Sequence, residues 1–96
     1  MAVIIHTKPG CPSCDKAETL LRDNGIPYTK VKYYPESADY TERRDAMFDL
    51  HGHRSFPNIF IGDAFVGGFA ELKAMASTNR LEEMLTAAGI SVQDLF

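Results

Sequence analysis

The chain of 96 residues lacks the features of several common protein classes. It has ten Lys and Arg against thirteen Asp and Glu, a net charge of −3, so no overall positive field favours nucleic acid or an anionic membrane. No apolar run approaches the roughly 18 residues of a membrane span. The first residues lack the cationic segment and the cleavage site of a signal peptide. We therefore expect a protein that binds neither nucleic acid nor a membrane.

Cysteine is scarce as well, since Cys11 and Cys14 are the only two in the chain. A disulfide between them would close a loop too short to hold a fold together, so the pair is expected to serve chemistry in a reducing compartment, the cytoplasm. There are no repeats, linkers or low-complexity segments, and 45% of the residues are apolar. Residues 1–96 therefore predict one monomeric domain with a single hydrophobic core.

Cys11 and Cys14 stand in a C-x-x-C spacing between a predicted strand and a predicted helix. Residues 2–7 contain the β-branched apolar run of a buried strand. The helix has Pro12 at its first position, where proline is favoured, and it ends at Asn24-Gly25, a typical stop signal. A C-x-x-C motif between a strand and a helix predicts a redox-active dithiol.

The rest of the pattern predicts one small α/β domain of order β-α-β-α-β-β-α(-α), in which the first two strands are parallel. The expected elements are a strand at 28–33, a helix at about 38–50, strands at 58–61 and 64–66, a helix after Gly67-Gly68 and a helix capped by Asn79. Leu72, Met75 and Ala76 are expected to face inward. Residues 90–96 are left unassigned.

Cys11 is the expected nucleophile of the pair. At the start of the predicted helix, free N–H groups and the positive end of the helix dipole favour the thiolate, and Lys8 adds a cation nearby. Asp15 in the first turn opposes both. On balance we expect the pKa of Cys11 to lie below about 7. Cys14 lies one turn deeper on the apolar stripe, which suits a resolving thiol that attacks a mixed disulfide on Cys11.

Two sets of side chains leave alternatives open. The cysteines could be inert, or could form half of a zinc site completed by His6, His51 and His53. The two histidines at the helix end are more simply explained by solvation or local hydrogen bonds, so no metal site is expected. Arg44 falls on or beside the inward face of the 38–50 helix. Its stem could snorkel to solvent, or its guanidinium could bind an anion at the rim of a site.

Three segments together resemble the motifs of the glutaredoxin family, over residues 2–88. Cys11-Pro12-Ser13-Cys14, with Lys8 before it, is similar to C-P-Y-C. Arg54-Ser55-Phe56-Pro57 is similar to the T-V-P segment and its preceding residue. Gly67-Gly68-Phe69-Ala70-Glu71 is similar to G-G-x-D-D. The resemblance is specific because all three motifs occur in order within an α/β pattern that was identified independently.

The resemblance implies an α/β protein of thioredoxin-like fold, with a four-stranded mixed sheet flanked by helices. It implies a glutathione-dependent thiol-disulfide oxidoreductase that reduces protein disulfides and glutathione mixed disulfides. In that reaction Cys11 takes up the glutathionyl group, and a second glutathione or Cys14 releases it. Pro57 would follow a cis peptide bond, and the backbone of Phe56 would pair with bound glutathione like an added strand.

The resemblance also assigns site residues. Catalytic roles are expected for Cys11, Cys14 and Lys8. Contacts to glutathione are expected from Lys8, Cys11, Ser13, Arg44, Arg54, Phe56, Pro57, Gly68, Phe69, Ala70 and Glu71. Three of these depart from the family pattern, since Ser13 replaces an aromatic residue, Phe56 a small β-branched one, and Ala70 the first aspartate of G-G-x-D-D. We therefore expect glutathione to bind through backbone and cationic contacts, but more weakly than is usual in the family.

Two other functions are compatible with the same residues. The chain could be a glutaredoxin-like electron carrier reduced by a thioredoxin reductase and serving one partner, such as ribonucleotide reductase. The missing carboxylate at Ala70 favours this alternative. The chain could instead bind an iron–sulfur cluster through Cys11 of two chains and two glutathiones, which the proline after Cys11 disfavours. The protein substrate and the reduction potential are left open.

Overall fold

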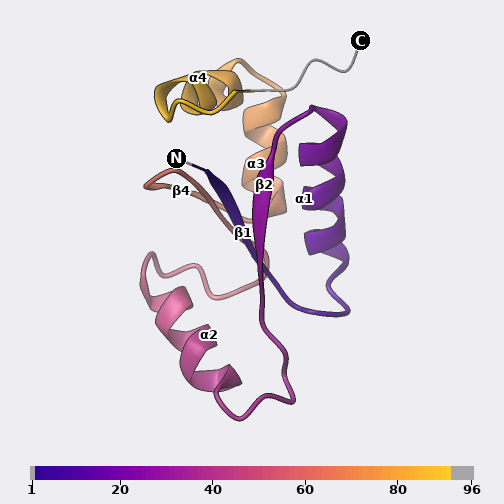
Figure 1. Ribbon diagram of the computed structural model, residues 1–96, viewed down its shortest axis with the longest axis vertical. Helices are drawn as coiled ribbons and strands as arrows, with labels where there is room; N and C mark the ends of the chain where they lie inside the picture. The colour runs from indigo at the N-terminus through magenta and orange to yellow at the C-terminus, as the bar shows by residue number, and fades with distance from the viewer. Residues whose placement is uncertain (1, 92–96) are drawn as a thin grey trace.

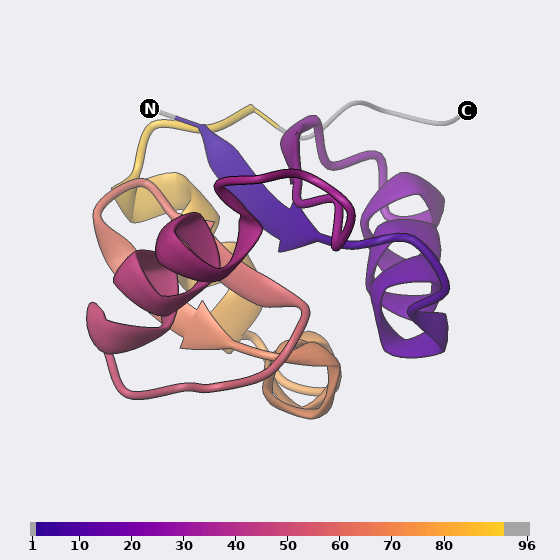
Figure 2. The same cartoon turned by 90° about the horizontal axis from the view of Figure 1, so that it is seen from below.

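The computed structural model describes residues 2–91 as a four-stranded sheet with helices against both of its faces (Figures 1 and 2). The strands are β1 Val3–Thr7, β2 Tyr28–Lys32, β3 Asn58–Ile61 and β4 Ala64–Gly67. The helices are α1 Pro12–Asp23, α2 Tyr40–Asp49, α3 Phe69–Ala76 and α4 Arg80–Ala87. The predicted order of elements is confirmed. Of the segment left unassigned, residues 92–96 lie, like Met1, outside the described residues.

The sheet is mixed and has the strand order β2-β1-β3-β4. β1 and β2 are parallel, whereas β3 is antiparallel to both β1 and β4. The connections explain this arrangement, because β1 reaches β2 through the crossover helix α1 and β3 returns as β4 through the two-residue turn Gly62-Asp63. The predicted thioredoxin-like fold is therefore confirmed. Within the described part of the chain, no helix is long and apolar enough to cross a membrane.

The hydrophobic core lies mainly between the sheet and the helices α1 and α3, which stand together on one side of it (Figure 1). Its buried members are Val3, Ile5, Ala17, Leu21, Ile26, Ile59, Ile61, Leu72, Leu81 and Leu85. A second, smaller cluster packs α2 against the chain and comprises Tyr33, Met47 and Phe48. The smaller cluster matters for function, since it supports the loop that precedes β3.

Three local predictions need correction. α2 begins at Tyr40 and not at Ala38, because the residues before it form turns. Ala76 is exposed and does not face inward, since α3 ends there. Asn79 precedes α4, but its side chain makes no capping hydrogen bond. The hydroxyl of Thr78 accepts the first amide of α4 instead, at 3.2 Å.

Candidate functional site

The cysteine pair lies at the start of α1, directly after the turn that follows β1. Cys11 is the capping residue of α1, and its Sγ accepts a hydrogen bond of 3.2 Å from the amide of Cys14. Pro12 occupies the first helical position, as predicted, because its fixed φ suits a helix start and it has no amide hydrogen to leave unpaired. Cys11 and Cys14 form a disulfide in this structure. An amide donor thus points at the sulfur that we expect to be the nucleophile.

The two sulfurs lie at different depths. Cys11 is 7% exposed and Cys14 is 1% exposed, the order that the helical pattern predicts. Cys14 shares the buried side of α1 with Ala17 and Leu21, whereas Asp15 is exposed in the first turn. A disulfide brought to the surface therefore meets Cys11 first. Cys14 is placed to attack a bond that has already formed on Cys11.

The loop before β3 lies beside the cysteine turn. His6 is opposite Asn58 in the antiparallel pairing of β1 with β3, so the residues after His6 run beside those before Asn58. Lys8 bridges the two segments, since its Nζ lies 5.6 Å from the ring centroid of Phe56. The Phe56–Pro57 peptide bond is cis, as the resemblance implies. The first two motifs are therefore neighbours in space.

The predicted cationic residues gather around two aromatic rings. The rings of Phe48 on α2 and Phe56 in the loop are packed edge to face, with centroids 5.3 Å apart. The guanidinium groups of Arg44 and Arg54 lie 5.9 and 5.5 Å from the centroid of Phe48. Because Lys8 lies over Phe56, all three cations are held at one end of the sheet.

Arg44 and Arg54 share one carboxylate. Asp45 Oδ1 lies 3.1 Å from a terminal nitrogen of Arg44 and 3.4 Å from one of Arg54, which also pairs with Asp49 at 2.8 Å. Hydrogen bonds to Asp45, and secondarily to Tyr40, hold the pKa of Arg44 above its ordinary value, so this side chain stays charged. An anionic ligand that binds both arginines would have to compete with Asp45.

The third motif packs against the same loop. Gly68 is the residue before α3, and a Cβ added there would lie 3.2 Å from Nε2 of His53 and 3.6 Å from the carbonyl oxygen of Pro57. Gly67 has a φ of 121°, a conformation that side chains disfavour, and the side chain of Glu71 folds over it. The start of α3 therefore approaches the loop closely because Gly68 leaves room for it.

The remaining predicted residues are Ser13, Phe69 and Ala70, at the starts of α1 and α3. Ser13 and Ala70 are exposed in the first turns of α1 and α3. Phe69 is half-buried against the main core, so its side chain supports α3, and its backbone is the part available to a ligand. Around the loop before β3, the structure brings together Lys8, Arg44, Arg54, Phe56, Pro57 and Gly68.

Three supporting residues, His6, Tyr33 and Arg43, were missing from the predicted site. The hydroxyl of Tyr33 lies 2.9 Å from Nδ1 of His6, and its ring lies 5.4 Å from that of Phe56. The guanidinium of Arg43 covers Tyr33 at 4.5 Å. Burial, and secondarily the charge of Arg43, lowers the pKa of His6, which favours a neutral ring. The alternation along β1 contained a signal for this role, because it places His6 on the face opposite Val3.

The two histidines that follow α2 have neighbours of their own. The ring of His51 stacks on Phe65 with centroids 4.5 Å apart and planes 9° from parallel. Nε2 of His53 lies 3.1 Å from Oγ of Ser55. His53 is thus hydrogen-bonded locally, as one of the sequence alternatives expected, whereas His51 is stacked although it is exposed.

Comparison with known sequences gives a consistent family. The glutaredoxin family model matches residues 3–66. A glutaredoxin of Ricinus communis is 36% identical over 88 residues, which cover 92% of this chain and 85% of the relative. A glutaredoxin of Neisseria meningitidis is 36% identical over 86 residues, which cover 86% of this chain and 94% of the relative.

Solved structures agree with the sequence comparison. Oxidized glutaredoxin 2 from Chlamydomonas reinhardtii superposes with a TM-score of 0.81 at 38% identity, covering 92% of this chain and 82% of that one. A buckwheat glutaredoxin–glutathione complex superposes with a TM-score of 0.83 at 25% identity, covering 92% and 79%. With its C-x-x-C pair at the start of α1, the chain belongs to the glutaredoxin family of thiol-disulfide oxidoreductases.

Proposed function

We propose that this glutaredoxin reduces protein disulfides and glutathione mixed disulfides, with glutathione as the reductant, Cys11 as the nucleophile and Cys14 as the resolving thiol. The observation that carries the proposal is the setting of Cys11. Its sulfur accepts an amide hydrogen bond at a helix start, beside a loop around which three cations gather. The buckwheat relative, solved with glutathione, supports the same ligand for this chain.

The chemistry of glutathione suits the side chains around this loop. Its two carboxylates call for cations, which Lys8, Arg44 and Arg54 supply, and for backbone amides such as that of Gly68 at the start of α3. Its extended backbone can pair with that of Phe56, the residue before the cis peptide bond. Lys8 has a second role in the proposal, because its positive charge favours the thiolate of Cys11 over the thiol.

Reduction of a glutathionylated protein takes two exchanges. The thiolate of Cys11 attacks the glutathione sulfur, the mixed disulfide breaks, and the protein leaves as a thiolate that takes up a proton. Cys11 now carries the glutathionyl group. The thiolate of a second, free glutathione attacks the sulfur of this glutathionyl group, forms glutathione disulfide and releases Cys11 as a thiolate. In the net exchange one free glutathione is consumed, and it leaves as glutathione disulfide together with the glutathionyl group that came from the substrate.

Reduction of a protein disulfide uses both cysteines. Cys11 attacks one sulfur of the substrate and forms a mixed disulfide with it, while the other substrate sulfur leaves as a thiolate. Cys14 then attacks Cys11, releases the second substrate thiolate and closes the Cys11–Cys14 disulfide, the state that the structure contains. Two glutathiones restore the dithiol through the same type of exchange.

The test is a steady-state assay with a glutathione–cysteine mixed disulfide, glutathione and glutathione reductase. The wild type and Cys14→Ser are expected to turn over, whereas Cys11→Ser is expected to lose all enzyme-dependent turnover. An inactive wild type that a thioredoxin reductase reduces readily would overturn the proposal. That result would favour an electron carrier that is reduced by a thioredoxin reductase. The observation that favours this alternative is Ala70, which is exposed and lacks the carboxylate found at this position of the family motif. The cytoplasmic location and the monomeric state stay predictions from sequence.

A further inference from the structure

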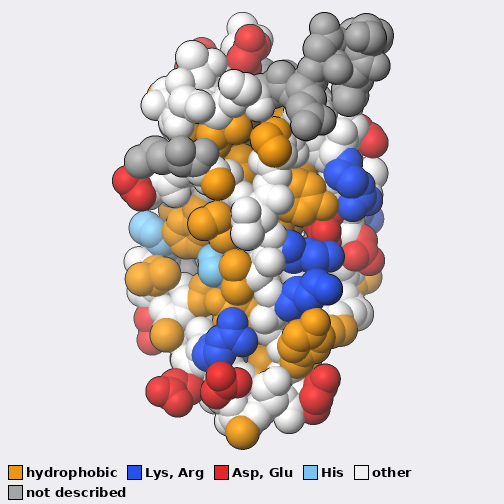
Figure 3. All heavy atoms as spheres, viewed as in Figure 1, with side chains coloured by type: hydrophobic (Ala, Val, Ile, Leu, Met, Phe, Trp, Pro, Cys, Tyr) orange, Lys and Arg blue, Asp and Glu red, His pale blue; other side chains and the backbone are white. Residues whose placement is uncertain are grey.

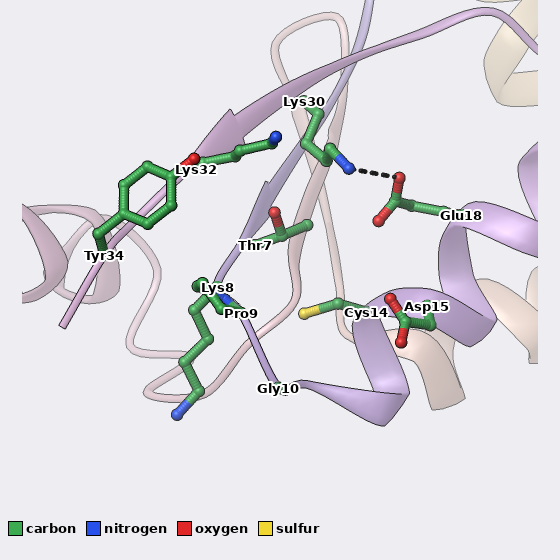
Figure 4. Close-up of a pocket in the computed structure, with 10 residues that line it drawn as sticks. All are labelled: Thr7, Lys8, Pro9, Gly10, Cys14, Asp15, Glu18, Lys30, Lys32 and Tyr34. Carbon is green, nitrogen blue, oxygen red and sulfur yellow. Dashed lines mark ion pairs between the residues drawn. The ribbon is translucent and has the colours of Figure 1, made fainter.

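A second surface reaches the cysteine pair from the side of β2. A hollow of about 230 Å³ lies between β2, the turn after β1 and the first turns of α1 (Figure 4). Cys14 lines it, together with Thr7 and Glu18, two polar residues that are only 4% and 7% exposed. The aromatic pair of Phe48 and Phe56 is not among its lining residues. The hollow therefore lies beside the loop to which we assign glutathione, shares Lys8 with it, and does not include its aromatic residues.

The charges of the hollow are unevenly compensated. Glu18 forms an ion pair of 3.2 Å with Lys30 and accepts a hydrogen bond of 3.0 Å from the hydroxyl of Tyr28, so the charge of Lys30 is already balanced. Lys32, at the end of β2, has no carboxylate partner among the described residues. It lines the hollow, and its side chain runs along β2 toward that of Lys30 (Figure 4). Asp15 lies at the opposite end, beside Cys14 (Figure 4).

Lys8 does not add a second free positive charge to the hollow. Its ammonium points away from Cys14 and from the hollow (Figure 4), and it lies over Phe56. Lys32 is therefore the cation that remains available within the hollow to an approaching anion. Because Asp15 lies at the α1 end and the charges of Glu18 and Lys30 offset each other, a negatively charged group is favoured at the Lys32 end of the hollow.

An exposed aromatic ring adjoins the cationic end. Tyr34 lines the hollow and is 40% exposed, and with Leu50 it is one of two large apolar side chains that stand exposed in the described chain. Figure 3 shows Lys and Arg side chains beside apolar ones on this face of the molecule. β2 is moreover an edge strand of the sheet, so its outer backbone groups can pair with an extended segment. An exposed tyrosine beside a strand edge is typical of a surface that binds protein, and the lysine adds attraction for a partner of negative charge.

We propose that the surface formed by Lys30, Lys32 and Tyr34, the β2 surface, binds an acidic segment of a disulfide-containing protein partner. A carboxylate of the partner meets Lys32, and its neighbouring side chains pack on Tyr34. The disulfide of the partner is thereby held close to Cys11, since the hollow is lined by Gly10, the residue before Cys11, and by Cys14, to which Cys11 is bonded. The inference rests on the proposed thiol-disulfide exchange and names the class of protein substrate that the exchange favours.

The test measures a single turnover, so it does not depend on glutathione as the reductant. The protein is reduced beforehand, freed of reductant, and mixed with either of two disulfide-bonded peptides. The peptides are identical except that one has two glutamates and the other two lysines beside the disulfide. Lys32→Glu is compared with Lys73→Glu, an exposed position on α3 where the net charge changes equally. A third substrate, the glutathione–cysteine mixed disulfide, shows whether a variant also affects the proposed glutathione site.

Lys32→Glu is expected to slow the acidic peptide about fivefold at low salt, to leave the glutathione–cysteine disulfide unchanged, and to lose its effect at high salt. Lys73→Glu is expected to change none of the three rates. Tyr34→Ala is expected to slow both peptides. The inference would be overturned if Lys32→Glu and Lys73→Glu slowed the acidic peptide equally. It would also be overturned if Lys32→Glu slowed the glutathione–cysteine disulfide as much as the acidic peptide. Failure of glutathione to regenerate the protein would instead contradict the proposed function, and would leave the peptide comparison intact.

Discussion

At the scale of single residues, His6 links the sheet to the site without contacting the cysteines. Its Nδ1 lies 2.9 Å from the hydroxyl of Tyr33, whose ring packs 5.4 Å from Phe56. A neutral imidazole can accept the hydrogen bond of the tyrosine, whereas a protonated ring brings a positive charge toward Arg43. The protonation state of His6 therefore bears on the packing of the loop.

The lowered pKa of His6 predicts a pH dependence of stability. Burial and Arg43 hold the folded-state pKa below 6.5, so in the window just below 6.5 the unfolded chain binds more protons than the folded one. The free energy of unfolding contributed by His6 is thus present above 6.5 and is lost as the pH falls toward the folded-state pKa. Urea unfolding at about pH 7.5 and about pH 5.5 should show a larger loss for the wild type than for His6→Gln. Equal losses would contradict the assignment.

Ala70 is the departure from the family pattern that bears most directly on glutathione affinity. It is exposed in the first turn of α3, where the family has an aspartate. Ala70→Asp is expected to lower the KM for glutathione about two- to fivefold without changing kcat, because an exposed ionic contact contributes up to about 1 kcal/mol. Ala74→Asp, at another exposed position of the same helix, is the control. The departure does not matter for binding if both variants behave like the wild type.

At the scale of elements, the approach of α3 to the loop before β3 depends on Gly68. Its φ is −100°, which any residue can adopt, so the need for glycine comes from the contacts that a Cβ would make. Gly68→Ala should therefore displace the ring of His53 by a few tenths of an ångström, whereas the 3.6 Å to the carbonyl oxygen of Pro57 is an ordinary contact. Such a shift changes the shape of the proposed glutathione site more than the packing of the hydrophobic core.

Gly68→Ala is expected to raise the KM for glutathione about three- to tenfold, with a change in the free energy of unfolding of less than about 1 kcal/mol. The steady-state assay and urea unfolding measure the two effects. Because the closest contact is with Nε2 of His53, the double variant His53→Ala/Gly68→Ala should recover part of the lost affinity. A normal KM in the single variant would show that the close approach of α3 is not needed.

The elements were predictable where sequence signals are local. Pro12 at a helix start, Asn24-Gly25 at a helix end and Gly62-Asp63 in a hairpin have direct backbone reasons, and the structure confirms all three. The start of α2 was less predictable, because this helix is mostly polar and its first turn follows a run of turns. Thr78 replaces Asn79 as the cap of α4, which depends on a backbone geometry that sequence does not specify.

The sequence indicated which cations to consider but not how they pair, and their contact with glutathione stays a prediction. The motifs named Lys8, Arg44 and Arg54 as cations, and the structure gathers them around Phe48 and Phe56. That Arg44 and Arg54 share Asp45 could not be foreseen, since their spacing along the chain does not place them on one helix face. The hydrogen bond between His6 and Tyr33 likewise joins residues 27 positions apart, through the parallel pairing of β1 and β2.

At the scale of the whole molecule, a main hydrophobic cluster packs the sheet against α1 and α3, and a smaller one packs α2 against the chain. The main cluster includes Leu72 of α3, which is completely buried, whereas Leu50 after α2 is 65% exposed. Leu72→Ala is expected to lower the free energy of unfolding by about 2–5 kcal/mol through lost burial and a residual cavity. Leu50→Ala should change it by less than about 0.5 kcal/mol. Chemical denaturation compares them, and similar costs would contradict the described core.

The central claim is that Cys11 carries the glutathionyl group and that Cys14 only resolves it. The most direct test is to incubate reduced Cys14→Ser with glutathione disulfide and to measure the intact mass, with Cys11→Ser as the matched control. The account predicts that Cys14→Ser gains the mass of one glutathionyl group, mapped by peptide analysis to Cys11 and removed by fresh glutathione. It predicts no adduct on Cys11→Ser, because its remaining sulfur is buried. An adduct on Cys14 in Cys11→Ser, or none on Cys11 in Cys14→Ser, would contradict the account.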